Sequence, residues 1–149
     1  RLWYFMLTEY TKLIRPISIS IVRNRDTILA YERHDDVTKK TFHRLVGGCI
    51  EFGETSIDAL KREFHEELSL KIMNIKLLES FESIFTFNNK LLHEIVYLYE
   101  SEFQESSVYD LDEIIGLEGD REFIARWIPV SDFIDNRYTL YPTKLMSHI

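Results

Sequence analysis

Residues 91–103, LLHEIVYLYESEF, carry apolar side chains on both faces of one extended segment. Ile95, Tyr97 and Tyr99 point one way, and the residues between them are also apolar. A strand of this kind is stable only inside a sheet that is covered on both sides. The chain must therefore supply neighbouring strands and a covering layer for each face of the sheet.

Other segments supply these strands. Ile17, Ile19 and Ile21 alternate with serines, which is the two-residue period of a half-buried strand. Turn-like residues at 24–26 and 88–90 each join two such segments into an antiparallel pair. The expected extended segments are residues 16–23, 27–33, 41–46, 72–87, 91–103 and 122–130, and the polar residues 104–121 are expected to form a loop.

One strongly amphipathic helix follows Thr55, whose side chain is suited to cap the first free backbone amides, with Asp58 three residues later. The apolar residues that recur at helical spacing are Ile57, Leu60, Phe64 and Leu68. A short helix is expected to begin at Ser131 and a last one near Pro142. Helices on two faces of a sheet predict an α+β domain in three layers, an α/β/α sandwich.

The chain has 149 residues, of which 45% are hydrophobic, so it can bury one core. We expect residues 1–149 to form a single domain. The sequence starts at an arginine, and we interpret residues 1–5 as an extension upstream of Met6, the expected natural start.

The net charge of −7 argues against binding to nucleic acid polymers or to acidic membrane surfaces, both of which need a basic field. A single cysteine, Cys49, excludes an internal disulfide and suits a reducing compartment. No apolar run reaches the ~20 residues of a membrane helix. We expect a cytoplasmic protein, and the aromatic N-terminal segment together with the 72–103 hairpin is compatible with a homodimer.

Carboxylates are crowded on one side of the predicted helix. Glu63 and Glu67 lie one turn apart, Glu66 lies near them, and all three flank the apolar stripe. Like charges at this spacing cost a few tenths of a kcal/mol per pair, so a positive partner should offset them. Oxygen-only clusters suit Mg²⁺ or Mn²⁺. The alternative is an ordinary acidic helix face in contact with solvent.

The spacing of residues over a longer stretch of the sequence favours a metal site over a solvated acidic helix face. A glycine is followed after five residues by a glutamate and after seven more by an R-E-F-H-E-E run, which resembles the Nudix box of the Nudix hydrolase (MutT-like) family. The matching residues are Gly48, Glu54, Arg62, Glu63, Phe64, Glu66, Glu67 and Leu70. Ser69 departs from the pattern, which has glycine there. If the backbone at Ser69 is left-handed, a non-glycine residue costs roughly 1 kcal/mol.

The resemblance implies a Nudix fold with a mixed parallel and antiparallel sheet between helices. It also implies Mg²⁺- or Mn²⁺-dependent hydrolysis of a diphosphate linkage in a nucleoside diphosphate joined to another moiety, with water attacking phosphorus. The implied metal ligands are the carbonyl of Gly47 and the carboxylates of Glu63, Glu66 and Glu67. The implied structural residues are Gly48, Glu54 and Arg62, with Arg62 pointing away from the metal side to bind Glu54.

A carboxylate must also accept a proton from the attacking water. The resemblance leaves two sources open for this base. One is Glu63 or Glu66 within the helix, and the other is an acid from residues 104–121 or just beyond. In the second group Glu118 is the first choice, followed by Asp120 and Glu122.

Substrate contacts are less defined. Arg33 and Arg44 are candidates for phosphate oxygens, and Phe42 or Tyr31 for stacking on a base. Surface cations and core aromatics are the alternative for all four, and Phe123 is expected to belong to the sheet packing. An alternative function is a catalytically inactive Nudix-like domain that senses a nucleotide and regulates a partner, and a third is a calcium-binding or purely structural acidic protein.

Overall fold

The computed structural model of the protein describes residues 12–149. The expectations for residues 1–5, for Met6 and for the aromatic N-terminal segment fall outside these residues. Within residues 12–149, no helix is long and apolar enough to span a membrane.

The described residues contain a mixed sheet in the order β5-β6-β1-β2-β8-β7, with β4 paired to β1 and β3 paired to β2. Strands β1 and β6 run parallel, and the other pairs are antiparallel. The predicted mixed sheet is therefore confirmed. The strands are β1 (Ile14–Asn24), β2 (Thr27–His34), β3 (Thr41–Arg44), β4 (Gly47–Cys49), β5 (Ile72–Phe87), β6 (Lys90–Phe103), β7 (Glu113–Glu118) and β8 (Arg121–Pro129).

A tight turn joins the two strands of each hairpin that the sequence predicts. Asn88 and Asn89 between β5 and β6 both have positive φ, 49° and 63°, the conformation that two-residue hairpin turns require. Strands β1 and β2 pair only next to their turn, at Arg23–Ile28 and Asn24–Thr27, and then separate. Their separation divides the sheet into one half around β1 and another around β2.

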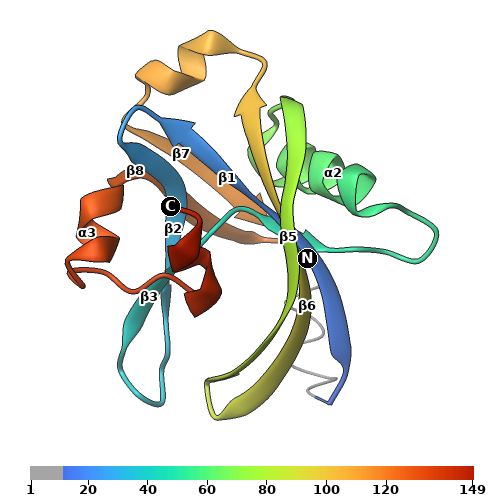
Figure 1. Cartoon of the computed structure of the whole chain (residues 1–149), viewed down its shortest axis with the longest axis vertical. Coiled ribbons are helices and arrows are strands. Elements are labelled where there is room, and N and C mark those ends of the chain that lie inside the picture. The colour runs from blue at the N-terminus through green and yellow to red at the C-terminus, as the bar shows by residue number, and fades with distance from the viewer. Residues whose placement is uncertain (1–11) are drawn as a thin grey trace.

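Helices cover both faces of this sheet (Figure 1). The long helix α2 (Ser56–Leu68) begins where predicted, because the Thr55 hydroxyl accepts a hydrogen bond from the Asp58 amide at 3.2 Å. The opposite side carries α3 (Val130–Ile134) and the 3₁₀ turn η2 (Thr143–Ser147), close to the positions expected for two short helices.

Two apolar clusters fill the spaces between these layers. Leu60 and Phe64 of α2 pack in one cluster with Tyr99 of β6, whereas Val96 and Leu98 of the same strand lie in the other, together with residues of α3 and η2. Strand β6 is thus buried on both faces, as its sequence predicts.

The prediction that residues 104–121 form a loop is wrong. They contain the 3₁₀ turn η1 (Ser106–Asp110) and the edge strand β7, which pairs with β8 from Glu113–Arg126 to Glu118–Arg121. Flanking acids and an internal glycine concealed this strand. A Cβ at Gly116 would lie 2.4 Å from the ring of Phe123 and 2.9 Å from Leu68, so glycine is needed for close packing there.

Candidate functional site

Two adjacent glycines bring the backbone of β4 against its neighbours. A Cβ at Gly47 would lie 2.1 Å from the carbonyl oxygen of Ser18 in β1, so only glycine fits. At Gly48 a Cβ would meet a different obstacle, the carboxylate of Glu63, with all three of its atoms between 2.6 and 2.9 Å away. The Glu63 carboxylate of α2 therefore lies directly over the backbone of Gly48.

Glu63 and Glu67 face the interior, on the side of α2 that the helical spacing predicts. Each residue is only 8% exposed, and the two lie one turn apart on the same side of the helix. Burial raises the pKa of the Glu67 carboxyl well above its ordinary value, and the nearby Glu63 and Glu118 carboxyls add to the shift. Two acids in contact in a poorly solvated place form a site that favours a cation.

Arg62 joins the loop before α2 to the helix. Its guanidinium donates to both carboxylate oxygens of Glu54, at 3.1 and 2.7 Å, and to the carbonyl oxygen of Cys49 at 2.9 Å. Hydrogen bonding by Arg62 is the main cause of the lowered pKa of the Glu54 carboxyl. The expected structural pairing of Arg62 with Glu54 is present.

The expectation that Arg62 points away from the metal side is wrong. Its Nη1 also donates to Glu63 at 2.8 Å and to the partly exposed Glu66 at 3.3 Å. A guanidinium carries five donors in a planar fork, so one side chain can reach the loop and the acidic face together. Glu66 is more exposed than Glu63 and Glu67, and it shares the Arg62 nitrogen with Glu63.

Glu118 approaches the buried pair from the end of β7. A small cavity of about 20 Å³ is lined by Gly47, Gly48, Glu67 and Glu118, among others. Of the acids weighed outside the helix, Glu118 is thus the one placed beside Glu67. Asp120 is exposed in the β7–β8 turn, and Glu122 lines a larger cavity on the other side of Glu118.

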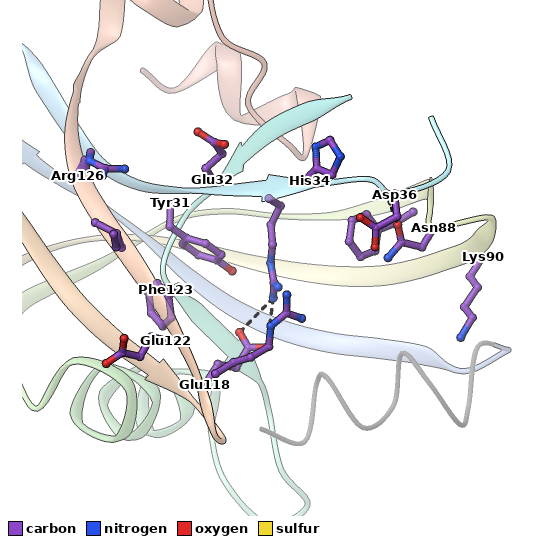
Figure 2. A pocket seen from close by; sticks show the side chains of 14 residues that line it. Tyr31, Glu32, His34, Asp36, Asn88, Lys90, Glu118, Glu122, Phe123 and Arg126 are labelled. Atoms are coloured by element: carbon purple, nitrogen blue, oxygen red, sulfur yellow. Dashed lines mark hydrogen bonds and ion pairs between the residues drawn. The ribbon is translucent and has the colours of Figure 1, made fainter. Parts of the chain in front are cut away.

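This larger cavity has a volume of about 670 Å³ and opens where β2 and β8 separate. Their pairing ends at Tyr31–Ala125, and beyond it β2 forms one wall and the β7–β8 hairpin the other. Figure 2 shows His34 and Asp36 on the first side and Glu118, Glu122 and Phe123 on the second. A volume of this size is typical of small-molecule sites.

Glu118 lines both cavities, and it is held there by Arg33. One Arg33 nitrogen, Nη2, donates to both carboxylate oxygens of Glu118, at 3.1 and 3.2 Å (dashed lines in Figure 2). The two side chains are only 12% and 9% exposed. Arg33 therefore lines the cavity, as expected of a substrate residue, but its guanidinium is engaged by a protein carboxylate.

The other substrate candidates lie deeper than expected. Phe42 is 6% exposed and packs edge-on against Phe87 and Tyr141, which matches the alternative of a core aromatic residue. Arg44 is buried, donates to Glu94 at 3.0 Å and lines the small cavity.

Tyr31 is also buried, and burial raises its pKa to about 12. Its ring packs 4.9 Å from that of Phe123. Phe123 was expected only in the sheet packing, but it also lines the large cavity. The sequence analysis did not identify Arg121 and Arg126 as cavity residues. The signal for them was an arginine directly before the mostly apolar segment 122–130 and another within it.

The donor set of the small cavity fits a hard divalent cation. The Glu67 carboxylate and the backbone of Gly47 in the cavity wall, and the Glu63 carboxylate over Gly48, offer oxygen atoms only, which suits Mg²⁺ or Mn²⁺. Within residues 12–149 no three His, Cys, Asp or Glu side chains converge into a complete protein cage. An ion here would take its remaining ligands from water or substrate phosphates, as Mg²⁺ commonly does.

Comparisons with solved structures give the same fold. A NUDIX hydrolase from Nitrosomonas europaea superposes with a TM-score of 0.63 at 15% identity, covering 91% of this chain and 85% of the other. A MutT protein from Bacillus halodurans gives 0.62 at 16% identity, covering 91% and 81%. A NUDIX-family hydrolase from Clostridium perfringens gives 0.61 at 14% identity, covering 91% and 93%.

A comparison with curated protein sequences gave no match. The family model described as NUDIX domain, by contrast, matches residues 14–145, which include every described strand and the whole of α2. The matched range, together with the placement of the box glycines and acids, shows that the chain belongs to the NUDIX family of hydrolases.

Proposed function

We propose that this protein hydrolyses a diphosphate linkage in a nucleotide or nucleotide sugar, with Mg²⁺ or Mn²⁺ as cofactor. The observation that carries the proposal is a pair of buried carboxylates on one side of α2, with a third carboxylate, Glu118, lining a cavity beside Glu67. The Glu63 carboxylate lies over the backbone of Gly48, and Glu67 and Glu118 line one small cavity together with Gly47 and Gly48. This point adjoins a cavity of about 670 Å³.

Each group has a task that its surroundings suit. Glu63, Glu67 and the Gly47 carbonyl would hold the metal, with Glu66 the most solvent-exposed of the proposed ligands. The bound metal supplies charge neutralisation for the phosphates and a lowered pKa for water. Glu118 would accept the proton of the attacking water, because its carboxylate lies at the boundary between the metal ligands and the cavity.

The large cavity supports a nucleotide substrate through its mixed lining. Arg121, Arg126 and Lys90 bring positive charge to an acidic protein, and Phe87 and Phe123 bring aromatic surface. Cations suit phosphate oxygens, and aromatic rings suit the base or sugar. The lining also carries Glu32, Asp36, Glu118 and Glu122, so these cations would meet phosphate oxygens as individual side chains and not as a net positive patch.

The direct test is a hydrolysis screen over nucleoside triphosphates and nucleotide sugars, with product release measured in Mg²⁺ and in Mn²⁺. We expect turnover that chelation with EDTA abolishes. Glu67→Gln and Glu63→Gln should each lower kcat by at least about 100-fold, since charge stabilisation by the metal is worth several kcal/mol. The circular dichroism spectrum should stay unchanged.

Glu82→Gln is the matched control, because Glu82 is an exposed carboxylate on β5. It should leave kcat unaltered. Full turnover by Glu67→Gln would remove the catalytic assignment. Tight nucleotide binding without turnover on any substrate would support the sensing domain instead.

A further inference from the structure

Glu118 lies at the end of β7, next to the turn of the β7–β8 hairpin, yet its side chain is almost completely buried. Its neighbours Gly119 and Asp120 are exposed, and Gly119 has a φ of +63°, as a tight turn requires. The Glu118 side chain is nevertheless only 9% exposed. A carboxylate so placed on a turn needs an anchor outside its own hairpin to keep one orientation.

Arg33 supplies this anchor from the opposite wall. The two residues are 85 positions apart in the chain, and Arg33 lies two residues beyond the last β2–β8 pair, Tyr31–Ala125. The backbone ladder no longer joins the walls at this level. The bond from Arg33 to both oxygens of Glu118 therefore spans the gap where the cavity opens (Figure 2).

Arg33 is itself fixed in place. Its guanidinium carbon lies 5.6 Å from the centre of the Tyr31 ring, on the same side of β2. Tyr31 is buried and packs against Phe123 of β8. A charged group whose position is set by a buried ring can hold a second charged group with little loss of conformational entropy.

From this geometry we infer that Arg33 is a positioning residue for Glu118, and that its main contribution is to kcat and not to substrate affinity. The inference rests on the proposed function. One terminal nitrogen of Arg33, Nη2, is bonded to both oxygens of the proposed base. A base displaced by about 1 Å can lose about 100-fold in rate, so the anchor matters most in the chemical step.

The test is a kinetic cycle on the full chain, with the best substrate of the screen. Arg33→Gln should lower kcat by about 10- to 100-fold and change KM by less than about 3-fold. Arg33→Lys, which keeps the charge but not the fork, should recover part of the loss. Adding Arg33→Gln to Glu118→Gln should lower kcat no further, because the anchor then has nothing to position.

Arg137→Gln is the control for loss of one arginine, since Arg137 is exposed and pairs only loosely with Asp132 at 3.8 Å. It should leave kcat unchanged, and a melting curve should show that each variant is folded. A rise in KM with unchanged kcat, or two substitutions whose effects multiply, would mean that Arg33 binds the substrate directly. An unchanged kcat and KM in Arg33→Gln would refute any role.

The outcomes also separate the two proposals. If the wild-type protein turns over no substrate, the proposed function fails and this inference fails with it. If the wild type is active but Arg33→Gln fails to lower kcat, only the inference about Arg33 is wrong.

Discussion

Ser69 occupies the one position that departs from the Nudix box, and its backbone has the conformation in which a non-glycine residue is strained. Ser69 ends α2 with φ 57° and ψ 33°, a left-handed conformation, and its amide donates to the carbonyl oxygen of His65 at 2.9 Å. Glycine is the usual residue at such a helix end, because it has no Cβ to oppose the conformation. We therefore expect Ser69→Gly to stabilise the protein.

The magnitude follows from two opposing effects. A left-handed backbone costs a residue with a Cβ roughly 1–2 kcal/mol, and Ser69→Gly removes this strain. Glycine also gives the unfolded chain about 0.4–1 kcal/mol more conformational entropy to lose. Ser69 is exposed, so the substitution removes no buried side chain. The net gain in the free energy of unfolding should be about 0.5–1 kcal/mol.

Urea denaturation and thermal melting measure this gain. For a chain of this length, 1 kcal/mol corresponds to a rise in Tm of about 2–4 °C, and the urea midpoint should rise with an unchanged slope. Ser106→Gly is the matched control, because Ser106 is exposed but does not have positive φ. It should lower the free energy of unfolding by up to about 1 kcal/mol. Equal or lower stability of Ser69→Gly would refute the strain at residue 69.

Other substitutions test the site and its supports. Gly48→Ala should displace the flexible Glu63 carboxylate and lower kcat with little change in Tm. Gly47→Ala places a methyl group against the backbone of β1 and should destabilise the fold by about 3 kcal/mol. Equal effects of the two substitutions on Tm would contradict these different roles. Arg62→Ala should lower the free energy of unfolding by about 2 kcal/mol in urea denaturation, because Arg62 bonds Cys49 at the end of β4, Glu54 in the loop and Glu63 in α2. No loss of stability would show that these bonds do not stabilise the fold. The Asp35 carboxylate accepts three backbone amides, and these bonds, led by that from residue 38, hold its pKa below the ordinary 3.8. The stability that the ionised Asp35 contributes is present above pH 3.8 and is lost as the pH falls through the lowered pKa. Asp35→Asn should therefore be less stable than wild type at pH 7, and circular dichroism should show the difference in the free energy of unfolding narrow at pH 2–3. A difference that stays constant with pH would argue against this linkage.

Local patterns in the sequence predicted the parts of the site that lie within one element. The helical spacing of Glu63 and Glu67 places both on the buried side of α2, and the two glycines before the helix mark the close approach of β4. The capping residue Thr55 likewise marks the start of α2. Each of these features depends on residues that are close in the chain.

Features that depend on distant residues were not predictable in the same way. The large cavity exists because β2 and β8 stop pairing at Tyr31–Ala125, and no local period encodes where a ladder ends. The Arg33–Glu118 pair joins residues 85 positions apart, one of them in a strand expected to be a loop. The sequence left both roles open for Phe42, because an aromatic residue on a short strand has the same local pattern whether it faces a ligand or other rings.

The division of labour between Gly47 and Gly48 has a consequence for how such a protein can change over generations. A methyl group added at Gly47 would clash with a backbone carbonyl and destabilise the fold. A methyl group added at Gly48 would clash only with the flexible side chain of Glu63. A single codon change at residue 48 could therefore silence the chemistry and leave a stable scaffold with its nucleotide-sized hollow intact. A hydrolase built in this way lies one mutational step from a binding protein.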